Sequence, residues 1–124
     1  MTPKDRPHNG KQERCYDLAE RTALFCERII ELLKQIPETA ITRRLIDQLV
    51  GASTSVGANY CEADEAVSKK EFRCKIGLCK KEAKETKFFI RMMAKAVPER
   101  AEDLRSLWRE GHELHMIFAA IYRK

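Results

Sequence analysis

Residues 51–72 read GASTSVGANYCEADEAVSKKEF, and this stretch decides the fold. Its first part keeps the apolar spacing of a helix, but small residues replace the usual leucines and isoleucines. A glycine inside a helix costs about 1 kcal/mol relative to alanine, so Gly51 and Gly57 need a compensating gain. The simplest gain is the close approach of a neighbouring backbone. The stretch therefore predicts a helix that packs tightly among others.

The end of the same stretch stops one helix and starts the next. Ser68 and Glu71 form a capping-box pattern that leads into an apolar run. Apolar residues recur at three- and four-residue steps on both sides, and Pro37 and Pro98 mark two further breaks. The predicted elements are a flexible N-terminal tail at 1–12 and helices at about 13–36, 40–66, 69–96 and 99–123.

Four helices with short connections predict an all-α fold, an up-down-up-down antiparallel four-helix bundle. The composition agrees, since 44% of the 124 residues are hydrophobic, 35% are charged and only 5 are glycines. The helical spacing places Ile41, Phe72 and Trp108 on the core faces of their helices.

Two helices carry a second apolar side. On helix 40–66 this strip lies about 100° from the core face, and on helix 69–96 it is mixed with charged residues. A helix that is apolar on two sides has two neighbours. We therefore expect an interface between subunits built from these positions: Ile46, Val50, Gly57, Cys61, Leu78 and Phe89.

Helix 69–96 concentrates the positive charge of the chain. Between residues 69 and 95 ten basic residues stand against three acidic ones, a net charge of +7, while the whole chain carries +5 and the remainder therefore −2. All the bases except Lys75 fall within about 120° of a helical wheel, along about 40 Å. These bases form the basic stripe: Lys69, Lys70, Arg73, Lys80, Lys81, Lys84, Lys87, Arg91 and Lys95.

Two interpretations of the basic stripe are open. It is either a solvated face that keeps the protein soluble or a face that binds the phosphates of RNA or DNA. A solvated face normally mixes charges of both signs, which favours the second interpretation. Phe88 is the only aromatic residue near the stripe, so stacking on bases is not predicted.

Polar residues also lie beside the predicted core. We interpret five of them as a structural network between helices or subunits, because a buried polar group is costly without a partner. A ligand or metal pocket is the alternative. The chain has no Glu-x-x-His motif, which argues against a ferritin-like di-metal enzyme, and no metal or cofactor is expected. The five residues are Ser55, Asn59, Glu62, Glu82 and Glu85.

The histidines give the alternative enzyme interpretation. Arg105 and His112 are seven residues apart on one helix face, a spacing that resembles the all-helical HEPN ribonucleases. The pattern is short and occurs easily by chance in a basic chain. His112 and His115 lack a third metal ligand nearby in the sequence, so we interpret them as core or interface residues. No catalytic residues are predicted.

Three motifs together resemble a known family. TSVGANYCEA at 54–63, SKKEF at 68–72 and KKEAKET at 80–86 are similar to four-helix-bundle proteins encoded by intervening sequences of bacterial ribosomal-RNA genes. The resemblance implies a homo-oligomer, a pentamer, without an established activity or catalytic set. The chain is also similar to the accessory subunit of diversity-generating retroelements, a basic pentamer that contacts a reverse transcriptase and nucleic acid.

These observations predict a non-enzymatic, homo-oligomeric binding or scaffold protein whose partner is nucleic acid or a nucleic-acid enzyme. A protein–protein adaptor and an HEPN-like ribonuclease remain the alternatives. The five cysteines are odd in number and include no C-x-x-C pair, and residues 1–12 are too polar for a signal peptide. We therefore expect reduced thiols, a cytoplasmic location and no membrane contact.

Overall fold

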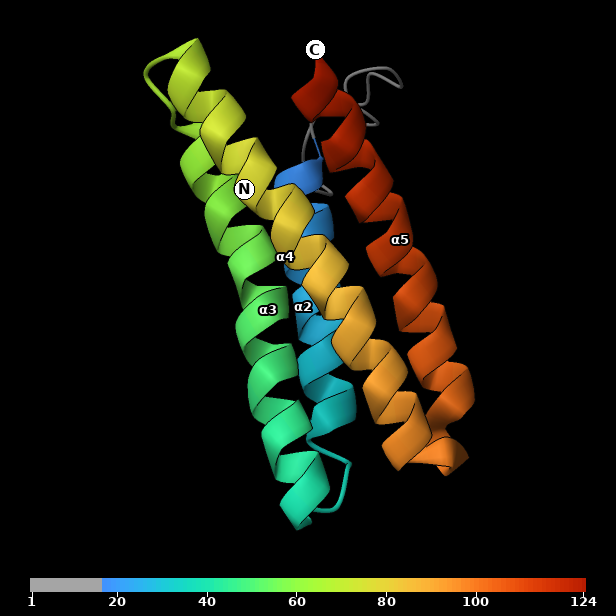
Figure 1. Cartoon of the computed structure of the whole chain (residues 1–124). Helices are drawn as coiled ribbons and strands as arrows, with labels where there is room; N and C mark the ends of the chain where they lie inside the picture. Colours follow the sequence, from blue (N-terminus) through green and yellow to red (C-terminus); the bar gives the residue numbers. More distant parts are fainter. Residues whose placement is uncertain (1–16) are drawn as a thin grey trace.

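The computed structural model describes residues 17–124. Four long helices run up, down, up and down in an antiparallel bundle, as predicted (Figure 1). The predicted tail at 1–12 and the predicted start of the first helix lie outside the described residues. No helix within residues 17–124 is long and apolar enough to cross a membrane. The elements are α2 (Leu18–Leu33), α3 (Ala40–Asp64), α4 (Lys69–Ala96), the short 3-10 helix η2 (Pro98–Arg100) and α5 (Ala101–Arg123).

Side-chain caps fix the starts of α3 and α4. The Thr39 hydroxyl accepts the Thr42 N–H at 3.0 Å, and the Thr42 hydroxyl accepts the Thr39 N–H at 2.8 Å. Ser68 accepts the Glu71 N–H at 3.0 Å, but the Glu71 carboxylate accepts from Val67 and not from the capping residue itself. The capping box predicted at Ser68 and Glu71 therefore forms only one of its two bonds, whereas Thr39 and Thr42 form a complete capping box at α3.

The core is a single apolar cluster to which all four long helices contribute, with Phe25, Val56, Ile90 and Phe118 among its fully buried side chains. Two predicted core residues lie outside it, because Ile41 is 66% exposed and Phe72 is 37% exposed. Each belongs to the first turn of its helix, where fewer neighbours surround a side chain. Trp108 is also partly exposed at the edge of the bundle.

The second apolar side of α3 faces α2 of the same chain. A Cβ atom on Gly57 would lie 3.7 Å from the Thr22 hydroxyl, and the Ser53 hydroxyl lies 4.0 Å from the Cys26 sulfur. Within the chain, therefore, the helix that packs against the second apolar side of α3 is α2. Gly51 differs, since a Cβ there meets nothing within 4 Å, and the predicted close approach of a backbone is wrong for this residue within the chain.

Candidate nucleic-acid interface

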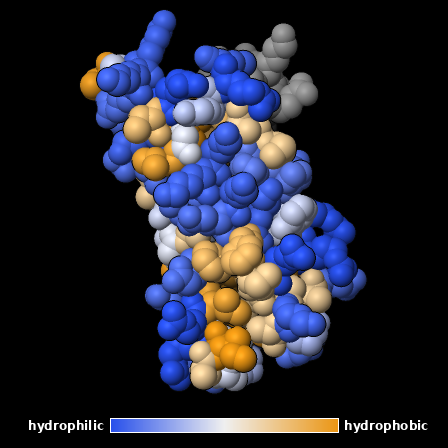
Figure 2. Space-filling view, in the orientation of Figure 1, coloured by the Kyte–Doolittle hydropathy of each residue, from blue (hydrophilic) through white to orange (hydrophobic). Residues whose placement is uncertain are grey.

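Helix α4 lies in front of α2 as drawn in Figure 1, and it carries the basic stripe. Seven of the stripe's nine residues are exposed, and only Lys80 and Lys87 are half-buried. None of the nine forms an ion pair with an acidic residue of the described chain. Figure 2 shows hydrophilic surface over the middle of this face and apolar surface below it. The positive charge of the basic stripe is therefore not neutralised by ion pairs within the described part of the protein.

Lys75, the one basic residue of α4 that lies outside the stripe on the helical wheel, does form an ion pair. Lys75 lies on the side of α4 that meets α3, and its ammonium group is 3.1 Å from the Glu62 carboxylate. The hydrogen bond to Glu62 raises the pKa of Lys75. Glu62 thus joins the two helices, as the predicted network required of it.

The other predicted network residues do not join one another. The Asn59 amide donates to the Ser55 carbonyl of its own helix at 2.9 Å. Glu85 is exposed, and Glu82 is half-buried with no side-chain hydrogen bond from its carboxylate to another described residue. Burial, and then the charge of Glu85, raises the pKa of Glu82. Within the described chain the five residues therefore form two separate contacts and no continuous network.

The predicted interface residues are mostly used within the chain. Ile46, Val50 and Phe89 pack against the core cluster, and Gly57 faces α2. Leu78 is half-buried beside a groove between α4 and α5, and Cys61 is exposed on α3. Of the six positions, Cys61 presents the most open surface.

Helix α5 brings rings to the basic stripe, which the sequence analysis missed. The Arg73 guanidinium carbon lies 4.1 Å from the centre of the Tyr122 ring, and the Arg73 Nε donates to the Tyr122 carbonyl at 3.1 Å. Farther along, the Lys87 ammonium lies 3.0 Å from Nδ1 of His112, whose ring stacks on Trp108 with ring centres 5.1 Å apart. The seam between α4 and α5 is thus both cationic and aromatic.

The ribonuclease interpretation depends on Arg105 and His112, which both lie near Trp108 on α5. Arg105 is exposed and lines a groove of about 390 Å³ with Arg91 and Trp108. His112 is occupied by its contact with Lys87 and by its stack on Trp108. Among residues 17–124 no group of three His, Cys, Asp or Glu side chains is placed to hold a metal ion.

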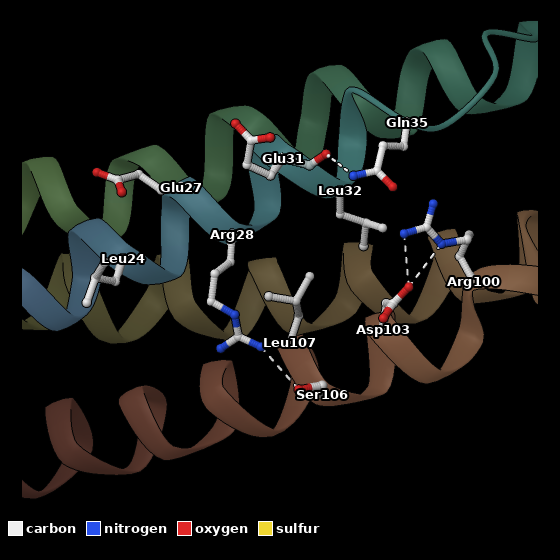
Figure 3. A pocket seen from close by; sticks show the side chains of 10 residues that line it. All are labelled: Leu24, Glu27, Arg28, Glu31, Leu32, Gln35, Arg100, Asp103, Ser106 and Leu107. Carbon is white, nitrogen blue, oxygen red and sulfur yellow. Dashed lines mark hydrogen bonds and ion pairs between the residues drawn. The ribbon is translucent and has the colours of Figure 1, made fainter.

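A third groove, of about 420 Å³, lies between α2 and α5 (Figure 3). It mixes charges, because its lining includes Glu27 and Glu31 from α2 as well as Arg100 and Asp103, which pair with each other at 2.9 Å. Arg28 donates across it to the Ser106 hydroxyl at 3.1 Å. Such a mixed lining suits a polyanion less well than the seam between α4 and α5 does.

The fold and this face define a basic four-helix bundle, and comparison with known proteins places it in a family. The family model of the 23S rRNA-intervening sequence protein matches residues 14–119, so the chain belongs to that family. A similar solved structure is a protein of unknown function from the S23 ribosomal protein family of Bacteroides thetaiotaomicron. It has a TM-score of 0.74 and 24% identity, over 86% of this chain and 98% of that one, a likeness that shows the fold alone. No curated protein matches the chain.

Proposed function

We propose that this protein is a non-enzymatic, homo-oligomeric binding protein that holds the phosphate backbone of nucleic acid along α4. The observation that carries the proposal is the uncompensated basic stripe, whose nine residues have no acidic partner in the described chain. Like charges on one face repel each other, so the stripe costs stability that binding of a polyanion recovers. Each phosphate neutralised also releases bound counterions, which adds to the affinity.

Surface features support assembly of several copies. Gly51, Thr54 and Ala58 leave exposed stretches of α3 with little side-chain volume, and Phe88 on α4 is 54% exposed. Assembly around an axis would repeat the basic stripe and make weak single contacts add up. The pentamer and a reverse-transcriptase partner rest on the resemblance of the sequence. Light scattering tests the assembly, and a clean monomer at micromolar concentration contradicts it.

The binding experiment compares two triple variants with equal changes of net charge. The first replaces Lys81, Lys84 and Arg91 by Glu, because these exposed residues form no ion pair within residues 17–124. The control with the same change of net charge replaces Lys34, Arg43 and Arg44 by Glu, all exposed near the connection between α2 and α3. Lys34 and Arg43 form only exposed ion pairs there, with Glu31 and Glu38. Fluorescence anisotropy with a labelled RNA and a labelled DNA gives the affinity as a function of salt.

We expect the first triple variant to lose binding and the control to keep most of it. The slope of log affinity against log salt should shrink by about 3 in the first variant, one for each phosphate contact removed. Equal losses in both variants would mean that only the net charge matters. Absence of binding by the native chain at low salt would leave the protein–protein adaptor, and cleavage of the RNA would support the ribonuclease.

A further inference from the structure

A groove of about 480 Å³ opens in the seam between α4 and α5, and the three charged side chains that line it are all lysines. Helix α4 contributes Lys80, Lys81 and Lys84, and α5 contributes His115 and Tyr122. No described Asp or Glu lines it. The volume lies within the range of small-molecule sites. The groove is therefore a local, concave part of the basic face.

His115 has a ring nitrogen that the described protein does not satisfy. Its Nδ1 atom is buried and makes no hydrogen bond. Burial lowers the pKa of His115, and the charges of Lys87, His112, Lys80 and Lys84 lower it further. A neutral imidazole carries one N–H, and a buried donor without an acceptor is rare in proteins. We therefore assign the proton to Nε2, the ring nitrogen that remains available to the groove.

Tyr122 forms the wall at one end of the groove, and a glycine makes room for it. A Cβ atom on Gly77 would lie 3.0 Å from Cε2 of the Tyr122 ring, closer than side chains normally pack. Arg73 lies over the ring, and the Lys80 ammonium is 5.2 Å from its centre. These contacts hold Lys80 at the edge of the groove.

We propose that this groove seats one phosphate group of the bound nucleic-acid backbone, contacted by Lys80, Lys84 and the Nε2–H of His115. The proposal rests on the function proposed above and adds a defined position to it. Ammonium and imidazole N–H groups are donors, and a phosphate group offers only acceptors toward them. A planar carboxylate is better matched by the fork of an arginine, whereas lysine recognises a phosphate as a point charge.

This phosphate site, called the seat below, makes the binding of nucleic acid depend on pH because it includes His115. A phosphate in the groove favours the cationic imidazole and offsets the repulsion from Lys80, Lys84, Lys87 and His112. The other titratable groups around the groove are Cys74, Lys81 and Tyr122. A backbone diester keeps a single charge between about pH 5.5 and about pH 7.5, so a change in affinity over this interval belongs to the protein.

The experiment measures binding of an oligomer of about ten deoxythymidines with a 5′-hydroxyl end, which offers diesters only. His115→Phe removes the N–H, whereas His115→Gln places an amide N–H near the position of Nε2. Lys84→Gln removes a charge inside the groove, and Lys95→Gln removes one from the same stripe outside it. We expect His115→Phe to lower the affinity about tenfold, as loss of a hydrogen bond to a charged group implies.

His115→Gln should recover most of the affinity at neutral pH but lose the gain toward acid. Lys84→Gln should weaken binding several-fold more than Lys95→Gln, although both reduce the salt slope by about 1. If His115→Phe binds as the native chain does, and the two lysine variants weaken binding equally, the seat is wrong while the proposed function stands.

A second arm does not need nucleic acid. Inorganic phosphate is titrated into the native protein while the imidazole NMR signals are recorded. The seat predicts that the His115 signals shift and that its pKa rises with phosphate. If phosphate shifts these signals but the oligonucleotide does not bind, the proposed function fails and the groove is a site for free phosphate. If neither phosphate nor oligonucleotide affects His115, the seat is overturned.

Discussion

The ammonium nitrogen of Lys87 lies 3.0 Å from Nδ1 of His112, so a cation of α4 is held against a ring of α5. The same ammonium lies 5.3 Å from the centre of the Trp108 ring. Burial, followed by the charge of Lys84, lowers the pKa of Lys87. This half-buried charge therefore acts on the other groups of the seam.

Replacing Lys87 should change the titration of a different residue. The charge of Lys87 lowers the pKa of His115, so Lys87→Met should raise it. NMR titration of the His115 ring measures this pKa directly. Lys95→Met removes an equal charge from an exposed position and should leave it unchanged. A His115 pKa that does not move in Lys87→Met would contradict the position of the ammonium group.

The stability of the fold should fall in mild acid because of His115. Its pKa is lowered in the folded chain, so between that pKa and the ordinary value near 6.5 the unfolded chain binds more protons. The contribution is complete above about pH 6.5 and is lost as the pH falls through the folded pKa.

Urea unfolding between about pH 5 and about pH 8 tests this dependence against His115→Phe. The difference in unfolding free energy should change with a slope of at most about 1.4 kcal/mol per pH unit, the limit for one group. Taking the difference removes the contribution of other groups, such as Glu82. Parallel pH curves for the two proteins would refute the expectation.

The pairing of Arg21 with Glu110 should stabilise the contact between α2 and α5. Two N–H groups of Arg21 reach the two carboxylate oxygens, each at 2.8 Å, and Glu113 lies 3.5 Å away. A double-mutant cycle with Arg21→Met and Glu110→Gln should give a coupling of about 1 kcal/mol, because the geometry is bidentate and part-buried.

The same cycle on Lys34 and Glu31 serves as the control. Both side chains are about two-thirds exposed, at 66% and 67%, so their coupling should lie below about 0.5 kcal/mol. Equal couplings in the two cycles would show that the Arg21 pair is no more than a surface ion pair.

Replacing Gly51 or Gly111 by alanine should change the unfolding free energy differently. A Cβ on Gly51 meets nothing, so Gly51→Ala should raise the unfolding free energy of the subunit by about 0.5 to 1 kcal/mol. A Cβ on Gly111 would lie 3.2 Å from the fully buried Phe25 ring, so the same gain should be absent there. Thermal unfolding of both variants checks the contrast, and equal gains would contradict it.

The sequence was sufficient to predict the bundle, because proline breaks, caps and apolar spacing all agree with one another. The exposure of the stripe followed from the same spacing. Ile41 and Phe72 were misplaced because periodicity describes a helix as if neighbours surrounded its whole length. The second side of α3 was assigned to another subunit from a helical wheel, which shows that a neighbour exists but not which one it is. Within the chain Gly57 and Ser53 of this side face α2, and the interface with another subunit stays a prediction.

The rings of the seam were missed because they come from α5. A wheel of one helix contains no information about side chains supplied by the next. The signal was nevertheless present, since the short connection between α4 and α5 fixes how the two helices pair. Counting back from it in both directions places Tyr122 opposite Arg73 and Trp108 opposite Lys87, as observed.

The succession of helices has a consequence for how the chain reaches its native state. Each long helix packs along the next one in the sequence, and α2 and α5 are the pair that must be brought together from distant parts of the sequence. Contacts between near neighbours in the sequence form quickly, because little loop entropy is lost. We therefore expect fast refolding, in which the hairpins form early and the docking of α2 against α5 comes last.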